Sequence, residues 1–188
     1  LSTDSEKYKK IGEKFGAEVP FLRSKKASKS NSMEEDVLED IRLKLIKENQ
    51  DLPDCVLWLR PTHPLRDLNL FKKAYLKFKK YKESVCIVSR TDQRIFISKH
   101  NKLIALNLNF KKKSMVRRQD CTQAYKIFHG EFFIFPKKYN KKFLGENIRY
   151  EVQNDICNID IDTEEEINLY QKIIELDKKK YEKFLHTT

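Results

Sequence analysis

The stretch Cys157-Asn158-Ile159-Asp160-Ile161-Asp162-Thr163-Glu164-Glu165-Glu166 changes from a strand pattern to a helix pattern. Isoleucine alternates with aspartate before Thr163, which is typical of a strand with one buried face. On such a strand Asp160 and Asp162 point the same way, because side chains two residues apart share a face. Thr163 and Glu166 have the spacing of a capping box. We therefore expect a strand over 156–161 and a helix over 164–184.

Two carboxylates at a strand end repel each other unless a cation lies between them. Mg²⁺ prefers oxygen ligands, keeps several waters and commonly bridges to substrate phosphates. Asp160 and Asp162 are accordingly candidate magnesium ligands. In the alternative reading, Asp160 is solvated and Asp162 is a loop residue at the start of the helix.

Outward from this stretch, strand patterns alternate with helix patterns. Apolar runs predict strands at 17–22, 55–59, 84–89 and 131–135, and amphipathic periodicity predicts helices at 6–15, 34–49 and 67–82. The continuous run Cys55–Leu59 suggests a strand buried on both faces of a parallel sheet. We expect an α/β fold, a three-layer sandwich with a mostly parallel sheet, in which ligands gather beyond the carboxyl ends of the strands.

A hairpin is predicted where Arg94–Ser98 and Leu103–Asn107 are joined across His100-Asn101. The 188 residues are enough for a single domain with a core, so we expect one domain over 1–188.

Composition restricts the classes of protein. Hydrophobic residues make up 39% of the chain, which excludes a disordered polymer, and the net charge of +11 favours anionic partners. The lysines are scattered, so a solvated basic surface is the default reading. The widely spaced cysteines show no zinc or redox spacing and indicate buried thiols in a reducing compartment. Without a signal peptide or an apolar run of bilayer length, we expect a cytoplasmic protein with no membrane partner.

Two further motifs carry cations that suit carboxylate or phosphate. The loop Arg60–Arg66 combines arginines, Thr62 and His63 between prolines, although a structural turn explains it equally well. Arg117-Arg118-Gln119-Asp120 is either an anion grip or a solvated basic run. The four glycines cannot form a phosphate-cradling loop, and His63 has no partners for a hydrolytic triad.

Together these pieces resemble the N-acylneuraminate cytidylyltransferases (CMP-sialic acid synthetases) and the related synthetases for other nonulosonic acids. Five stretches match the family's motifs in order: Ser2-Thr3-Asp4-Ser5, Gly16 to Arg23, Leu59 to Arg66, Arg117 to Asp120 and Ile159 to Thr163. The resemblance covers almost the whole chain. The I-D-I-D-T and R-R-Q-D runs favour the sialic-acid branch over synthetases for Kdo-like sugars.

The resemblance implies a Rossmann-like enzyme that transfers a cytidylyl group from CTP to an acidic nine-carbon sugar and releases pyrophosphate. It implies that Asp160 and Asp162 hold Mg²⁺ and act in catalysis together with Arg118. The expected nucleotide-binding residues are Asp4, Arg23 and Ser32. The expected sugar-binding residues are Arg60, Thr62, His63, Arg117, Gln119, Lys126 and His129. A homodimer is expected through a hairpin insert at about residues 90–112.

The chain departs from the family pattern at several positions. Arg60 replaces a glutamine, His63 replaces a serine, and His129 stands where an asparagine is usual. The family's amino-terminal strand and glycine-rich CTP loop have no counterpart, so we expect these 188 residues alone to have little or no activity. The departures keep open a non-catalytic relative that binds a sugar or a partner. A nucleic-acid-binding domain rests on net charge alone, so no nucleic-acid partner is expected.

Overall fold

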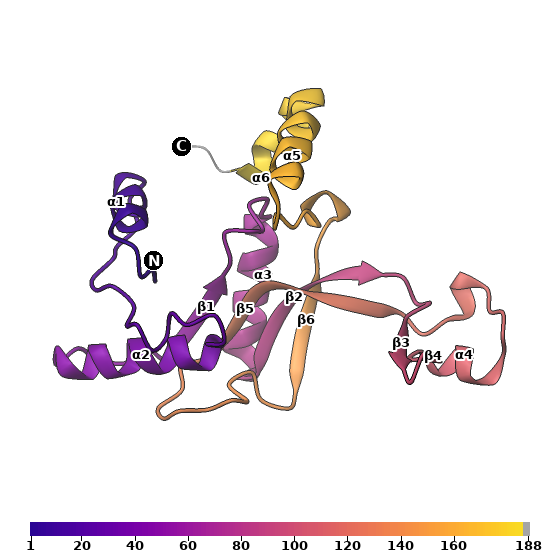
Figure 1. The fold of residues 1–188 in the computed structure, drawn as a ribbon, viewed down its shortest axis with the longest axis horizontal. Coiled ribbons are helices and arrows are strands. Elements are labelled where there is room, and N and C mark those ends of the chain that lie inside the picture. The colour runs from indigo at the N-terminus through magenta and orange to yellow at the C-terminus, as the bar shows by residue number, and fades with distance from the viewer. Residues whose placement is uncertain (186–188) are drawn as a thin grey trace. The chain divides into compact units, whose positions relative to one another are not determined.

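The computed structural model describes residues 1–185, except the side chains of Phe128, His129, Ile156, Lys183 and Leu185. It is a mixture of helices and strands in two compact units (Figure 1). The first unit contains Leu1–Val56 and Phe133–Asn147, and the second contains Leu57–Phe132 and the chain from Ile148 onward.

The first unit is built on two helices. Helix α1 (Glu6–Lys14) begins at Ser5, whose hydroxyl accepts a hydrogen bond from the Tyr8 amide, and α2 (Glu34–Lys47) buries Val37 and Leu38. Both helices were predicted, but α1 buries none of its residues, although its periodicity suggested an apolar face.

The strand predicted over 17–22 is wrong, because these residues form an irregular segment. Pro20 has no backbone N–H for a strand ladder. The segment is fixed instead by isolated hydrogen bonds, from the Leu1 amino group to the Glu18 carbonyl and from the Arg23 amide to the Thr3 carbonyl.

A four-stranded sheet has the order β1-β5-β2-β6. Its strands are β1 (Cys55–Leu59), β5 (Ala124–Ile134), β2 (Ser84–Thr91) and β6 (Ile148–Val152). Strand β2 pairs antiparallel with β5 and parallel with β6. The α/β class is confirmed, whereas the expected mostly parallel sheet is not, because the long strand β5 runs against β2. Strand β6 was not predicted.

Helix α3 (Leu68–Tyr81) packs on this sheet within the second unit (Figure 1). Asp67 caps it by accepting hydrogen bonds from the amides of Asn69 and Leu70. The Phe132 ring contacts the rings of Phe71, Tyr75 and Phe78 at centroid distances of 6.4, 5.8 and 6.5 Å. Strand β2 is buried from Ser84 to Ser89, as predicted. Strand β1 is not buried on both faces, because Leu57 and Leu59 are 38% and 40% exposed.

The predicted hairpin is confirmed as β3 (Phe96–Lys99) and β4 (Lys102–Ala105), which pair antiparallel. His100 and Asn101 have φ of 51° and 58°, the backbone of a two-residue hairpin turn. The short helices α4 (Leu108–Lys112) and η1 (Arg118–Asp120) follow, and β3, β4 and α4 form an arm of the second unit (Figure 1).

The strand predicted over 156–161 is wrong. Asp155–Cys157 is the 3₁₀ helix η2, and residues 158–162 form an irregular connection without strand pairing. The predicted helix 164–184 is divided at Asp177 into α5 (Glu164–Leu176) and α6 (Lys178–Leu185). The predicted capping box is confirmed: the Thr163 hydroxyl accepts from the Glu166 amide, and the Glu166 carboxylate accepts from the Thr163 amide.

Candidate active site

The connection that carries Asp160 is fixed against the loop that follows β1. The Ile161 amide donates to the Thr62 carbonyl at 2.9 Å. Cys157 is buried in an apolar cluster with Leu65, and Ile159 packs against that cluster. The two segments therefore meet, although residues 158–162 are not a strand and the argument that Asp160 and Asp162 share a strand face fails.

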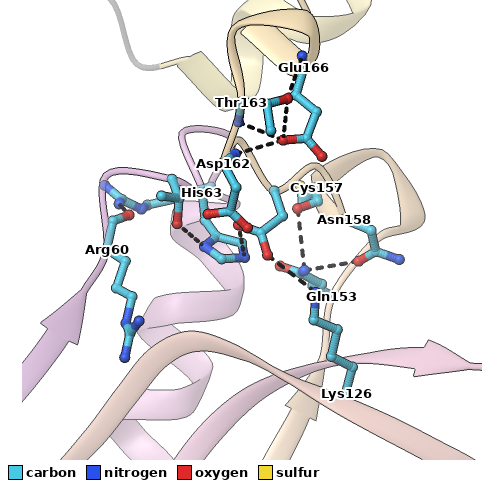
Figure 2. A network of polar contacts seen from close by, with 12 residues as sticks. Arg60, His63, Lys126, Gln153, Cys157, Asn158, Asp162, Thr163 and Glu166 are labelled. Carbon is cyan, nitrogen blue, oxygen red and sulfur yellow. Dashed lines mark hydrogen bonds and ion pairs between the residues drawn. The ribbon is translucent and has the colours of Figure 1, made fainter. Parts of the chain in front are cut away.

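The Asp160 carboxylate lies between groups from two other elements (Figure 2). Its Oδ2 is 3.2 Å from Nζ of Lys126 on β5, and its Oδ1 is 3.4 Å from Nε2 of His63. Burial alone would raise the pKa of Asp160. The Lys126 hydrogen bond, the charges of His63 and Lys126 and the Thr62 hydroxyl outweigh burial and hold the pKa below its usual range. Asp160 is thus an anion at neutral pH.

His63 is 3% exposed and is part of the packing under Asp160. Its Nδ1 lies 3.0 Å from the Thr62 hydroxyl, while its Nε2 faces Asp160. In this arrangement the ring buttresses the carboxylate rather than facing solvent. A short series of contacts, Thr62–His63–Asp160–Lys126, results.

Sequence reasoning missed Gln153, which holds the same connection. The Gln153 side chain, at the end of β6, donates to the Cys157 carbonyl at 3.3 Å and to Oδ1 of Asn158 at 2.9 Å (Figure 2). The Gln153 amide donates to the Val88 carbonyl, so these bonds tie the connection to the sheet. No sequence signal marks an isolated glutamine for such a role.

Glu166 closes the connection on its other side. Its carboxylate accepts from the amides of Asp162 and Thr163 at 2.8 Å each. These bonds lower the pKa of Glu166, against the opposing negative charge of Asp160. The Asp162 side chain itself is exposed.

Arg118 and Gln119 line a separate hollow of about 520 Å³ with Arg90, Gln93, Gln123 and Tyr125. Tyr125 and Lys126 are neighbours on β5, so their side chains point to opposite faces of the sheet. The structure therefore places Arg118 and Gln119 apart from the Lys126–Asp160 pair. Arg117 forms an ion pair with Asp120, Nε to Oδ2, at 2.7 Å.

The other expected residues lie as follows. The Arg60 carbonyl accepts from the Arg66 guanidinium at 2.7 Å, and the Arg60 charge reaches the buried Glu131. The His129 side chain is outside the described part of the structure. In the first unit, Asp4 faces Arg23 at 3.6 Å, and the Ser32 hydroxyl donates to the Lys26 carbonyl.

The carboxylates of Asp160 and Asp162 are of the type that binds a magnesium ion. In the described part of the chain no group of three metal-ligating side chains is preassembled. Mg²⁺ needs only one or two protein carboxylates when waters and phosphates complete its shell. Asp160 would supply such an oxygen, with Asp162 close by in sequence. The bound ion would neutralise phosphate charge during group transfer.

No helix in the described residues combines the length and the apolar character that a bilayer crossing requires. No model of a known protein family matches the chain.

Over 176 residues the chain is 27% identical to the pseudaminic acid cytidylyltransferase of Campylobacter jejuni subsp. jejuni serotype O:23/36 (strain 81-176). The match covers 85% of this chain and 71% of that protein. The protein of the same name from serotype O:2 (strain ATCC 700819 / NCTC 11168) matches with the same identity and coverage. At this distance the similarity supports the cytidylyltransferase family that the motifs indicated, and it does not support the N-acylneuraminate branch in particular.

Proposed function

We propose that this chain is a cytidylyltransferase that activates a nonulosonic acid, an acidic nine-carbon sugar, with CTP. The products are the CMP-sugar and pyrophosphate. The observation that carries the proposal is the position of Asp160, which is held as an anion where the motif segments at 59–66 and 159–163 meet. The similarity to two pseudaminic acid cytidylyltransferases supports the same reaction class.

Asp160 and Asp162 are proposed to hold Mg²⁺ on the triphosphate. Such an ion offsets the charge that develops on the transferred phosphoryl group, which is the main catalytic demand of this reaction class. Lys126 and Arg60 are proposed to face the sugar carboxylate, because cations form strong charge-assisted bonds to carboxylates. Arg118 and Gln119 are proposed to bind an anionic part of a substrate at their hollow.

The test is pyrophosphate release from CTP with Mg²⁺ and either pseudaminic acid or an N-acylneuraminic acid. Because little activity is expected of these 188 residues alone, we expect weak turnover with at least one sugar, and a loss of about 10²-fold or more in kcat for Asp160→Asn relative to that rate. Glu165→Gln is the control, because it likewise replaces a carboxylate by an amide in the same region, but at an exposed position. Equal activities of wild type and Asp160→Asn would contradict the assignment.

The alternative is a non-catalytic relative that binds a sugar or a partner. It is favoured by one observation, namely that Asp160 already faces the Lys126 ammonium and the His63 ring. Calorimetric binding of CTP or sugar without any turnover would support it.

A homodimer through the arm of β3, β4 and α4 is part of the proposal. The arm exposes large apolar side chains, among them Leu103, Ile104 and Leu108. Several exposed apolar side chains on one short arm suit a protein contact surface if they form one patch. Sedimentation velocity should show a dimer, and Leu103→Asp should shift it toward monomer.

A further inference from the structure

Both oxygens of Asp160 face nitrogen atoms that carry or can carry positive charge. Lys126 Nζ is 3.2 Å from Oδ2, and His63 Nε2 is 3.4 Å from Oδ1. The Asp160 side chain is 27% exposed, so the carboxylate is only partly solvated and needs such neighbours. Its negative charge is therefore compensated within the chain itself.

A divalent cation at Asp160 competes directly with one of these neighbours. Mg²⁺ lies at about 2.0–2.1 Å from its oxygen ligands, so an ammonium on the same oxygen is displaced by contact and by charge repulsion. His63 is buried between Thr62 and Asp160 and has little room to move. Lys126 is 54% exposed and has a flexible four-carbon stem. Lys126 is the group that can leave.

A second carboxylate makes the position attractive for a cation. Glu166 and Asp160 repel each other electrostatically, and the Glu166 oxygen that accepts from Asp162 and Thr163 fixes that carboxylate in place. When Lys126 leaves, a cation beside Asp160 also offsets this smaller repulsion.

We propose that Lys126 is the resident counter-ion of Asp160, that a divalent cation displaces its ammonium, and that the displaced ammonium then binds an anionic group of the substrate. The second half of this inference rests on the proposed function, whereas the first half concerns the chain and the metal alone. It follows that the metal and the acidic substrate favour each other's binding. Thermodynamic linkage makes this coupling reciprocal.

The first arm of the test uses Mn²⁺ alone, without nucleotide or sugar, and measures free Mn²⁺ by electron paramagnetic resonance. We expect Lys126→Gln to bind Mn²⁺ roughly 2- to 5-fold more tightly than wild type, the range that loss of a half-exposed ion pair allows. Lys126→Arg keeps the charge and should stay near wild type.

Two controls locate the effect. Lys77→Gln removes the ion pair of Lys77 with Glu151 and should leave Mn²⁺ affinity unchanged. Adding Asp160→Asn to Lys126→Gln should abolish the tighter binding. Unchanged or weaker Mn²⁺ binding in Lys126→Gln, no Mn²⁺ binding in either protein, or a gain that persists without Asp160 would each overturn the inference.

The second arm measures calorimetric affinity for a nonulosonic acid with and without Mn²⁺. In wild type we expect Mn²⁺ to tighten sugar binding several-fold, and in Lys126→Gln we expect no such coupling. A wild-type chain that binds no sugar contradicts the proposed function, and the Mn²⁺ arm then still decides the role of Lys126. Equal coupling in wild type and Lys126→Gln would overturn the second half of the inference.

Discussion

At the scale of single residues, Glu131 stands out because its ionisable carboxyl group is buried in the sheet. It lies buried on β5 directly opposite Cys86 of β2. Burial raises the pKa of Glu131 to about 7, although the charge of Arg60 acts in the opposite direction. Burial and the Glu131 charge likewise raise the pKa of the Cys86 thiol to about 12. Near neutral pH, Glu131 is therefore divided between its neutral and charged forms.

This predicts a pH-dependent stability with a definite sign. The pKa of Glu131 rises from an ordinary 4.5 to about 7 on folding, so the folded state holds a proton that the unfolded state releases. The stabilising contribution of this proton is complete below pH 4.5 and is lost as the pH rises through 7. At pH 8, Glu131→Gln should therefore raise the free energy of unfolding, relative to wild type, by on the order of 2–3 kcal/mol.

Thermal midpoints of the two proteins at about pH 5 and pH 8 measure the effect. The difference between Glu131→Gln and wild type should grow toward pH 8. The same change at the exposed Glu146 should give no pH-dependent difference. A constant offset for Glu131→Gln across this range would show that Glu131 does not titrate there.

At the scale of elements, α3 approaches the sheet closely at Gly130. A Cβ at this position would lie 2.9 Å from Phe71 Cζ and 3.1 Å from Ile87 Cγ1. We expect Gly130→Ala to lower the free energy of unfolding by about 1–2 kcal/mol, because an added methyl group overpacks this contact. Urea unfolding measures the change through the midpoint at constant slope.

A double-mutant cycle separates this contact from a backbone effect of the glycine. Phe71→Leu shortens the side chain that the new methyl group would meet. In the Phe71→Leu background, Gly130→Ala should therefore cost clearly less than in wild type. An equal cost in both backgrounds would mean that the loss does not come from the contact between α3 and β5.

The sequence predicted correctly those elements whose ends or burial are set by residues close together in the chain. The Asp67 cap of α3, the Thr163–Glu166 capping box of α5 and the apolar run of β2 all lie where the sequence indicated. Alternation at Ile159-Asp160-Ile161-Asp162 misled, because a strand also needs a neighbour with a free edge. These residues have a single backbone bond to Thr62 instead of a ladder.

The candidate site was predictable where motif segments were expected at the same edge of the sheet. The meeting of the 60–66 loop with Asp160 followed from expecting both at one edge of the sheet, and the Ile161–Thr62 bond confirms that they meet. Gln153 and the burial of His63 depend on tertiary packing between β6, the loop and the sheet. Neither has a spacing that a sequence pattern can show.

At the scale of the whole molecule, the dominant property is the net charge of +11. The charge is spread over both compact units, with lysine runs at 137–142 in the first and at 178–180 in the second. Scattered charge of one sign adds little to specific contacts but produces a long-range field. Such a positive field raises the rate at which anions meet the protein.

If CTP and an acidic sugar are the substrates, this field should appear as a salt dependence of turnover. Exposed charges are screened beyond about 10 Å at 0.1 M ionic strength. Raising NaCl from about 25 to about 250 mM should therefore lower kcat/KM several-fold, and kcat should change little because bound substrates are already inside the field. Initial rates of pyrophosphate release at constant free Mg²⁺ measure both constants.

Two comparisons isolate the effect of the field: one between different salts, and one between wild type and variants with fewer lysines. Sodium acetate at equal ionic strength should act like NaCl, because screening depends on ionic strength and not on the anion. Replacing exposed lysines of the 137–142 run by glutamine should flatten the salt dependence without lowering kcat, because these side chains act at a distance. A kcat/KM that is independent of salt, or that falls only with chloride, would mean that substrate capture is governed by short-range contacts at the Asp160 site rather than by the charge of the whole chain.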